Sequence, residues 1–402
     1  MATDLNAARE YLSSNNIAGW LTRDYRYTNP IFFAALGYQP NNLTRPVWLW
    51  IPADNEPRLL AHDVDVNRFE GNDIEISVYG NRDAMVSTLK SLLPDRGKVA
   101  MDYSPLYELP RVARVDAGSV ELVRSFGIEV VSSGGVSQYA TERWNATQLA
   151  SHRYAMTELV NIMHESFNFV GENVRWALTE HDVAEFIRGR YDRAGLYTDE
   201  GPVVAFNANS SDPHYEPTPE NSSIIRRNGW LLIDSWAKPS SITPFVDEGS
   251  GDASEPVYAD ITWVAKIGDD PSPDHIKVFD SVRRGRDAAY EFIRNRHLNG
   301  EATRGWQADR VARESIAQDG YGQWFVHRLG HSVGPEVHSN AVNLDDWETH
   351  DTRQLIPGLC VTIEPGIYLP EFGVRSEMDI YISENDVEIT GEIQDRIHQI
   401  ST

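Results

Sequence analysis

The chain has 402 residues, of which 41% are hydrophobic and 24% charged, and its formal net charge at pH 7 is −24. This composition excludes an intrinsically disordered chain, and the length suggests two domains. Because strong acidity repels anionic surfaces, we expect neither nucleic acid nor a membrane among its partners.

The basic residues are almost all arginines, because the lysines are limited to Lys90, Lys98, Lys238, Lys266 and Lys277. We interpret this acidic, Lys-poor composition as halophilic, since concentrated salt screens the self-repulsion of such a chain. An ordinary acidic protein is the alternative. The start of the chain lacks a signal sequence, and no apolar run approaches the ~20 residues that span a bilayer. We therefore expect a cytoplasmic protein, in which the single cysteine, Cys360, is a small buried apolar residue.

Helices and strands alternate over the first part of the chain. The pattern predicts helices over 5–12, 84–93 and 118–126, and strands over 47–51, 74–78 and 98–101. This is an α/β domain over residues 1–139, and it carries no cluster of His, Cys or acidic residues.

A second domain is expected over residues 140–402. It begins with a helix over 148–170 that has a continuous apolar stripe. Thr179 and Asp182 form a capping box that starts the next helix. A strand over 202–208, helices over 274–296 and 304–318, and strands from residue 360 onward follow. The fold class is therefore α/β, with an α+β second domain.

Four carboxylates and one histidine of this domain are candidate metal ligands: Asp234, Asp260, His331, Glu364 and Glu377. The first ends the apolar run Gly-Trp-Leu-Leu-Ile-Asp, the second lies within Val-Tyr-Ala-Asp-Ile-Thr-Trp-Val, and the fourth follows Leu-Cys-Val-Thr-Ile. The histidine lies in the turn Gly-His-Ser-Val-Gly. Strand periodicity places Arg375, Glu377 and Asp379 on one face. Three apolar strands are thus predicted to carry carboxylates.

Carboxylates on buried strands cost several kcal/mol unless they are paired or bind a cation. Two divalent cations would balance four carboxylates, with the imidazole as a neutral fifth ligand. We therefore expect two divalent metal ions per chain. Oxygen ligands with one nitrogen suit manganese, which we favour, and also cobalt, zinc or iron.

The chain resembles the pita-bread metallopeptidases, which include Xaa-Pro dipeptidase (prolidase), aminopeptidase P and methionine aminopeptidase. Four motifs in order carry the resemblance: Asp-Pro-His-Tyr around His214, His-Arg-Leu-Gly-His-Ser-Val-Gly-Pro-Glu-Val-His over 327–338, Glu-Pro-Gly-Ile-Tyr at Glu364 and Gly-Val-Arg-Ser-Glu at Glu377. The family's metal ligands are two Asp, one His and two Glu in this order, which match the five candidates. The resemblance implies a creatinase-like N-terminal domain, a pita-bread catalytic domain and a homodimer.

The resemblance also implies an activity, hydrolysis of the Xaa-Pro bond at the N-terminus of dipeptides or short peptides by a metal-bridging hydroxide. Asp260 and Glu377 would bridge the two metals, Asp234 would complete one metal's shell, and His331 with Glu364 would complete the other's. Glu364 would in addition carry a proton to the leaving nitrogen.

Four further residues are assigned to the site. By resemblance, His214 and His338 stabilise the oxyanion and orient the substrate. Arg375 shares a face with Glu377, so we expect it to bind a buried acid or a substrate carboxylate. His327 is a candidate for substrate binding, for a hydrogen bond behind the ligands, or for a structural role.

One segment departs from the family pattern. An acidic stretch rich in Ser and Gly, residues 240–255, separates Asp234 from Asp260. Since lengthening a surface loop costs little, we expect an enlarged hairpin that keeps both aspartates on paired strands. We expect this loop to shape the access of substrate.

Three other functions stay open. The first is an enzyme of the same fold that acts on a small osmolyte, as an ectoine hydrolase or a sulfonium lyase does. The second is a pita-bread domain that only binds its ligand. The third is a serine esterase, because Gly330 to Gly334 matches the nucleophile-elbow pattern, with His398 downstream. Against the esterase, His327 and Arg328 interrupt the buried strand that should precede an elbow.

Overall fold

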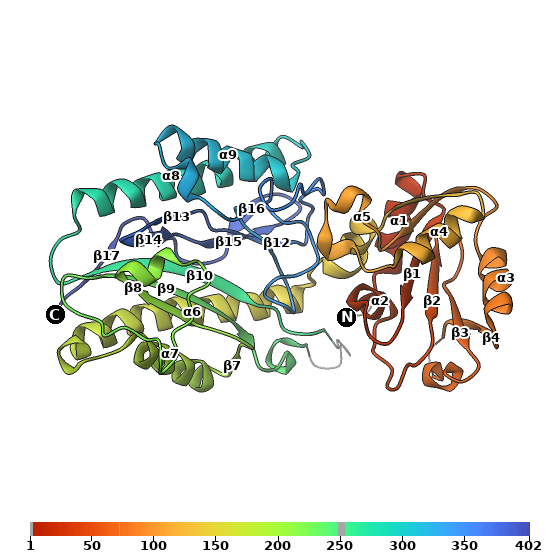
Figure 1. The fold of residues 1–402 in the computed structure, drawn as a ribbon, viewed down its shortest axis with the longest axis horizontal. Helices are drawn as coiled ribbons and strands as arrows, with labels where there is room; N and C mark the ends of the chain where they lie inside the picture. Colours follow the sequence, from red (N-terminus) through yellow and green to blue (C-terminus); the bar gives the residue numbers. More distant parts are fainter. Residues whose placement is uncertain (1–2, 72, 248–253) are drawn as a thin grey trace. The chain divides into compact units, whose positions relative to one another are not determined.

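A computed structural model describes residues 3–71, 73–247 and 254–402 of the chain (Figure 1). The chain divides into two compact units, Met1–Arg143 and Trp144–Thr402, where the sequence pattern suggested a boundary after residue 139. Each unit contains its own clusters of buried apolar residues.

The first unit contains a six-stranded mixed sheet in the order β4-β3-β2-β1-β5-β6. Its strands are β1 (Gly19–Asp24), β2 (Val47–Pro52), β3 (Arg58–His62), β4 (Glu75–Tyr79), β5 (Gly97–Met101) and β6 (Ile128–Ser132). Its helices are α1 (Leu5–Ser14), α2 (Pro30–Leu36), α3 (Arg82–Leu92), α4 (Ala117–Ser125) and α5 (Gly134–Ser137), with short helical turns η1 (Val66–Phe69), η2 (Pro105–Tyr107), η3 (Pro110–Val112) and η4 (Gln138–Glu142). The six elements predicted here are confirmed, with ends within two residues.

Both faces of this sheet are covered. Trp20 of β1 packs with α1 and α2 residues in one apolar cluster, whereas the next residue, Leu21, packs with α3 and α4 residues in another. Successive side chains of a strand point to opposite faces, so burial on both faces requires an unbroken apolar strand. β2, whose six residues are all buried, is such a strand.

The second unit contains the remaining elements. Its helices are α6 (Ala146–Asn173), α7 (Glu180–Ala194), α8 (Pro273–Leu298) and α9 (Gly305–Gln318), with turns η5 (Val174–Trp176), η6 (Asn207–Ser211), η7 (Thr243–Phe245) and η8 (Gly322–Trp324). Its strands are β7 (Leu196–Tyr197), β8 (Val203–Phe206), β9 (Trp230–Pro239), β10 (Ala259–Ile267), β11 (Ser332–Val333), β12 (Cys360–Ile363), β13 (Gly366–Leu369), β14 (Phe372–Arg375), β15 (Met378–Ile382), β16 (Val387–Ile389) and β17 (His398–Ile400).

Strands of the second unit lie between two pairs of helices (Figure 1). One sheet has the order β17-β10-β9-β7, with β8 paired to β9, and another has the order β11-β12-β15-β16; β13 and β14 form a hairpin. Helices α6 and α7 cover β8, β9 and β10, and α8 and α9 lie on the other side of the strands. The main apolar cluster of the unit fills the space between α6, α7 and the first sheet.

The predicted hairpin is confirmed, because β9 and β10 pair antiparallel with Asp234 opposite Thr262 and Asp260 opposite Trp236. Of the connecting segment 240–255, residues 248–253 lie outside the described part of the chain. The capping box of Thr179 and Asp182 at the start of α7 is also confirmed.

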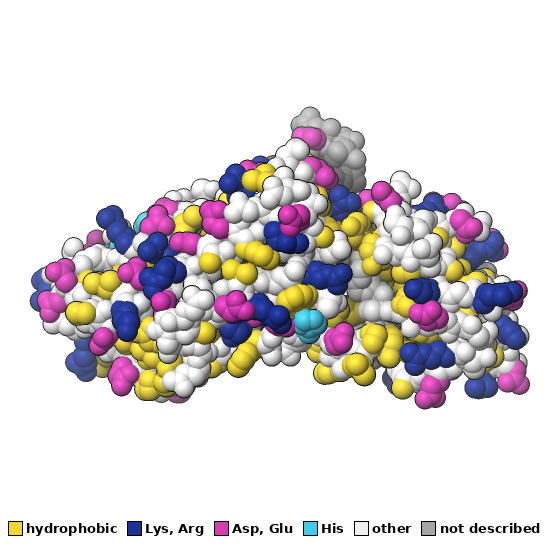
Figure 2. All heavy atoms as spheres, turned by 90° about the horizontal axis from the view of Figure 1, so that it is seen from above, with side chains coloured by type: hydrophobic (Ala, Val, Ile, Leu, Met, Phe, Trp, Pro, Cys, Tyr) yellow, Lys and Arg dark blue, Asp and Glu magenta, His cyan; other side chains and the backbone are white. Residues whose placement is uncertain are grey.

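Charged side chains of both signs are interspersed over the face shown in Figure 2, with apolar side chains between them. Among the residues that the structure describes, no helix combines the length and the apolar character needed to cross a membrane.

Candidate metal centre

The candidate ligands lie where the strands of the second unit meet. In the register of β9 and β10, Asp234 and Asp260 project from the same face. Glu377 follows β14, and its backbone N–H donates to the carbonyl of Thr262 on β10 (3.1 Å). Its Oε2 accepts a hydrogen bond from the hydroxyl of Thr262 (2.7 Å). Glu377 is therefore fixed beside Asp260.

The last two candidates join this group from the other sheet. The backbone N–H of His331 donates to Thr362 Oγ1 (3.0 Å), and that of Glu364 donates to the carbonyl of Leu329 (2.8 Å). Nε2 of His331 lies 3.5 Å from Glu364 Oε1 and 3.7 Å from Asp260 Oδ2. Ligand atoms of Asp260, His331 and Glu377 all lie within 4.8 Å of one another. The structure thus brings together Asp260, His331, Glu364 and Glu377, which come from four separate segments.

The bonding of the acids fits a metal centre. Among the residues that the structure describes, Asp234 Oδ1 and Asp260 Oδ1 are buried oxygens without a hydrogen-bond partner. Burial, together with the charges of neighbouring carboxylates, raises the pKa of both Asp260 and Glu377 well above the ordinary range. Burial also raises the pKa of Glu364 to about 7, against the opposing charges of Arg375 and Arg328. A bound cation would supply the missing partners and favour the ionised forms.

Arg375 is bound to these acids. Its Nη2 donates to Asp234 Oδ2 (2.5 Å), its Nε donates to Thr262 Oγ1 (3.0 Å), and its Nη1 donates to the hydroxyl of Tyr368 (3.1 Å). Its Nε lies 3.9 Å from Glu364 Oε2. The guanidinium is therefore paired with an acid of the candidate centre, and its other predicted role, binding a substrate carboxylate, stays a prediction.

Asp379 is a buried acid. The sequence pattern predicted that it shares a strand face with Glu377, but it assigned no function to the residue. Its Oδ2 accepts a hydrogen bond from the backbone N–H of Asp260 (2.9 Å), and its Oδ1 is buried without a partner. Cys360 and His152 lie next to it. Burial raises the pKa of Asp379 well above its ordinary range.

The two predicted catalytic histidines are both exposed. The ring of His338 lies edge-to-face against that of His331, with 4.2 Å between the centroids, so His338 borders the cluster. His214 follows η6, and its backbone N–H donates to Asp212 Oδ1. Its loop is connected to the β13–β14 hairpin, because Ser210 Oγ accepts from the N–H of Gly373 and Ser211 donates to the carbonyl of Leu369.

His327 has partners on both ring nitrogens. Its Nδ1 lies 2.6 Å from the carbonyl of Arg328, so this nitrogen carries the proton. Its Nε2 lies 2.7 Å from the hydroxyl of Tyr368, which accepts from Arg375 and therefore donates to His327. Burial lowers the pKa of His327 to about 3, so the ring is neutral. These contacts favour a role in which His327 supports the candidate metal ligands through hydrogen bonds, and they do not favour a role in substrate binding.

The esterase interpretation does not fit the structure. Ser332 lies on β11 with its hydroxyl buried, whereas a nucleophile elbow exposes its serine at a sharp turn between strand and helix. His398 lies on β17, where its ring stacks on Phe167 at 4.6 Å. Burial raises the pKa of Cys360 well above its ordinary range, as expected for an apolar role.

Residues 154–243 and 251–384 match the profile of metallopeptidase family M24. The chain belongs to this family. Among its relatives, an uncharacterized peptidase of Staphylococcus haemolyticus is 27% identical over 67% of this chain and 68% of that protein. The Xaa-Pro dipeptidase of Pyrococcus furiosus is 43% identical over 20% of this chain and 22% of that protein. The M24 match includes the five candidate ligands.

Solved structures of M24-type enzymes share the fold of nearly the whole chain. The dipeptidase PepE of Mycobacterium ulcerans superposes with a TM-score of 0.70 at 20% identity, covering 99% of this chain and 97% of that one. The prolidase of Thermococcus sibiricus has a TM-score of 0.64 at 19% identity, covering 98% of both chains. The M24 chain therefore has the pita-bread fold with an N-terminal α/β domain.

Proposed function

We propose that this M24 protein is a dinuclear-metal hydrolase that cleaves the Xaa-Pro bond at the N-terminus of dipeptides or short peptides. The observation that supports it best is the buried cluster of Asp260, His331 and Glu377, together with the buried oxygens of Asp234 and Asp260 that no described residue hydrogen-bonds. The names of the similar solved enzymes, dipeptidase and prolidase, support the substrate class.

In this proposal the five candidate ligands hold two divalent ions. We favour manganese over cobalt, zinc or iron as the metal. When bound, such ions polarise a carbonyl oxygen and lower the pKa of water towards ~7. Asp260 and Glu377 lie beside each other and would help to hold both ions. Asp234 would help to hold one ion, and His331 with Glu364 would help to hold the other.

The surrounding side chains position the reacting groups and move protons. Glu364 is also assigned the transfer of a proton to the leaving nitrogen, because its Oε1 lies beside His331 in the candidate centre. His338 borders the cluster and is exposed, so it is suited to donate a hydrogen bond to the oxyanion. His214 is assigned the orientation of the substrate, and Arg375 holds Asp234 in place.

The proposal extends to the whole protein. Residues 1–139 and 140–402 are taken as the N-terminal and catalytic domains of a halophilic, cytoplasmic homodimer. The net charge of −24 supports a halophilic protein, and the single buried cysteine supports a cytoplasmic location. Sedimentation velocity in concentrated KCl tests the proposed dimer. A monomer at micromolar concentration would contradict it.

The activity is tested by the hydrolysis of Ala-Pro and Ala-Pro-Ala after reconstitution with Mn²⁺ in concentrated KCl. Chelator-sensitive cleavage of either peptide, with Ala-Ala left intact, is the expected result. The preferred peptide length then defines the enzyme as dipeptidase or aminopeptidase. Folded, metal-loaded protein that cleaves neither peptide would refute the Xaa-Pro activity and favour a small osmolyte as the substrate.

A further inference from the structure

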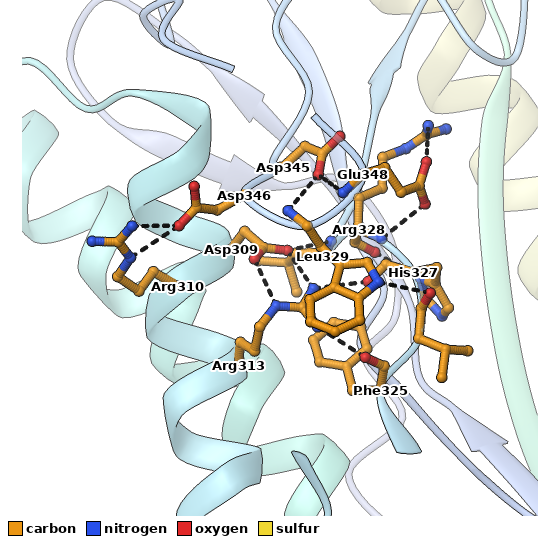
Figure 3. Close-up of polar contacts among 12 residues, drawn as sticks. Asp309, Arg310, Arg313, Phe325, His327, Arg328, Leu329, Asp345, Asp346 and Glu348 are labelled. Carbon is orange, nitrogen blue, oxygen red and sulfur yellow. Dashed lines mark hydrogen bonds and ion pairs between the residues drawn. The ribbon is translucent and has the colours of Figure 1, made fainter. Parts of the chain in front are cut away.

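The segment from Phe325 to Leu329 leads directly to the candidate ligand His331 but belongs to no strand of the described sheets. Exposed or unpaired backbone groups of such a segment would leave it mobile. Here, side chains from two sides bind its backbone, as Figure 3 shows.

Helix α9 supplies one side through Asp309 and Arg313. Arg313 Nη1 donates to the carbonyl of Phe325 (2.9 Å), and its Nη2 donates to the carbonyl of His327 (2.8 Å). Asp309 Oδ1 accepts from the backbone N–H of Leu329 (2.9 Å). Asp309, which is fully buried, also accepts from Nη2 (2.8 Å) and Nε (2.9 Å) of Arg313. We call these two residues the Asp309–Arg313 clamp.

The loop after residue 344 supplies the other side. The indole N–H of Trp347 donates to the carbonyl of Val326 (3.0 Å), and Glu348 Oε1 accepts from the N–H of Arg328 (3.0 Å). The guanidinium of Arg313 lies 4.1 Å from the ring centroid of Phe325 and 4.6 Å from that of Trp347. The guanidinium of Arg313 is therefore close to two aromatic rings, a favourable position for such a group.

The clamped segment contacts the metal centre at three points. The carbonyl of Leu329 accepts from the backbone N–H of Glu364, and His331 follows two residues later. His327 binds Tyr368, which in turn accepts from Arg375. A displacement of the segment would therefore move His331, which precedes β11, and Glu364, which follows β12.

We propose that the Asp309–Arg313 clamp is a positioning pair that holds His331 and Glu364 at the separation required for metal binding. This role rests on the proposed metal site. The clamp needs the planar fork of Arg, because one side chain donates to two carbonyls and to a carboxylate at once. Lysine is a compact charge without that geometry.

Arg313→Lys tests the proposal, with Arg310→Lys as its matched control. Arg310 lies on the same helix, where it forms an ion pair with Asp346 and stacks on Trp306; within the described part of the chain it has no hydrogen bond or ion pair to segment 325–329. We expect the dissociation constant for Mn²⁺ to rise about 10–100-fold in Arg313→Lys and to stay at the native value in Arg310→Lys, as measured by calorimetry. Added guanidinium ion should partly restore Mn²⁺ binding to Arg313→Ala, whereas the same concentration of KCl should not.

Hydrogen exchange of the metal-free full-length protein provides a second readout. We expect faster exchange of the peptide covering 325–331 in Arg313→Lys than in Arg310→Lys. If Arg313→Lys does not fold, Asp309→Asn replaces it, because Asn removes the charge opposite Arg313 and should give the same changes.

The two proposals fail in different ways. Native Mn²⁺ affinity in the Arg313 variant would overturn the positioning role, whatever the exchange results show. Native protein that folds but binds no Mn²⁺ would overturn the metal site. It would also overturn the clamp's proposed role, even if the exchange results show that the clamp orders the segment.

Discussion

Asp234 and Asp260 each have one buried carboxylate oxygen that no described residue hydrogen-bonds, although their other oxygens face Arg375 and His331. An unpartnered charge of this kind would destabilise the fold by several kcal/mol. A bound cation removes that cost, so the same atoms that make the metal-free protein less stable make metal binding favourable.

His338 gives the first prediction at this scale. His338→Ala should keep the native metal content, because His338 borders the cluster and is not one of the five candidate ligands. Its kcat/KM for Ala-Pro should fall by about 10²–10³, the typical effect of losing an oxyanion donor. Native turnover in this variant would remove His338 from the site.

The pH dependence of metal stabilisation follows from Glu364. Its pKa of about 7 in the metal-free fold lies above the ordinary value of about 4.3. The folded metal-free protein therefore binds this proton more tightly than the unfolded chain, and the resulting stability is lost as pH rises through about 7.

Metal binding has the opposite dependence, because it requires the ionised carboxylate. The increase in Tm that Mn²⁺ gives over chelator should therefore grow between pH 5.5 and 7.5. Differential scanning fluorimetry at fixed KCl measures this increase. An increase that is constant with pH would contradict the assigned ligand.

At the scale of elements, Gly330 packs closely between the clamped segment and β12. A Cβ at this position would lie 2.1 Å from the backbone carbonyl oxygen of Thr362, and both residues lie beside His331. Gly330→Ala should therefore destabilise the protein by about 1–3 kcal/mol and weaken Mn²⁺ binding.

Gly189 of α7 is the matched control, because a Cβ there meets no other atom within 4 Å. Gly189→Ala should stabilise the protein by about 0.5–1 kcal/mol, since Gly is costly in a helix. Denaturant unfolding measures both variants. Native stability and native Mn²⁺ binding in Gly330→Ala would show that the close packing is not required.

Much of the element pattern follows from the sequence. Helices with clear apolar stripes and caps, such as α6, α7 and α8, were predicted in place. The strand β1 and the helix α2 were not, because their sequences are short and apolar and their burial depends on the rest of the domain. Ligand spacing and motif order identified the candidate metal centre.

Other parts of the site depend on contacts distant in the sequence. The link from Arg375 through Tyr368 to His327, the bond between Asp379 and Asp260, and the Asp309–Arg313 clamp all join residues of separate elements. The i, i+4 spacing of Asp309 and Arg313 signals an ion pair on a helix, but it does not show that the pair binds a loop.

At the scale of the whole molecule, the net charge of −24 sets the response to salt. Self-repulsion should destabilise the protein in dilute buffer, and screening should relieve it. We expect Tm to rise steadily from 0.1 M to 2 M KCl, with most of the rise absent when an uncharged solute replaces the salt. A Tm that is independent of KCl would contradict adaptation to concentrated salt.

The number of metal ions that the chain binds tests the central claim most directly. Equilibrium dialysis against Mn²⁺ in concentrated KCl, followed by elemental analysis, should give two ions per chain for the native protein. Glu377→Gln, whose fold is checked by circular dichroism, should retain one ion or none, because it loses a bridging carboxylate. Folded native protein that binds no metal, or a Glu377→Gln variant that retains both ions, would contradict the dinuclear centre.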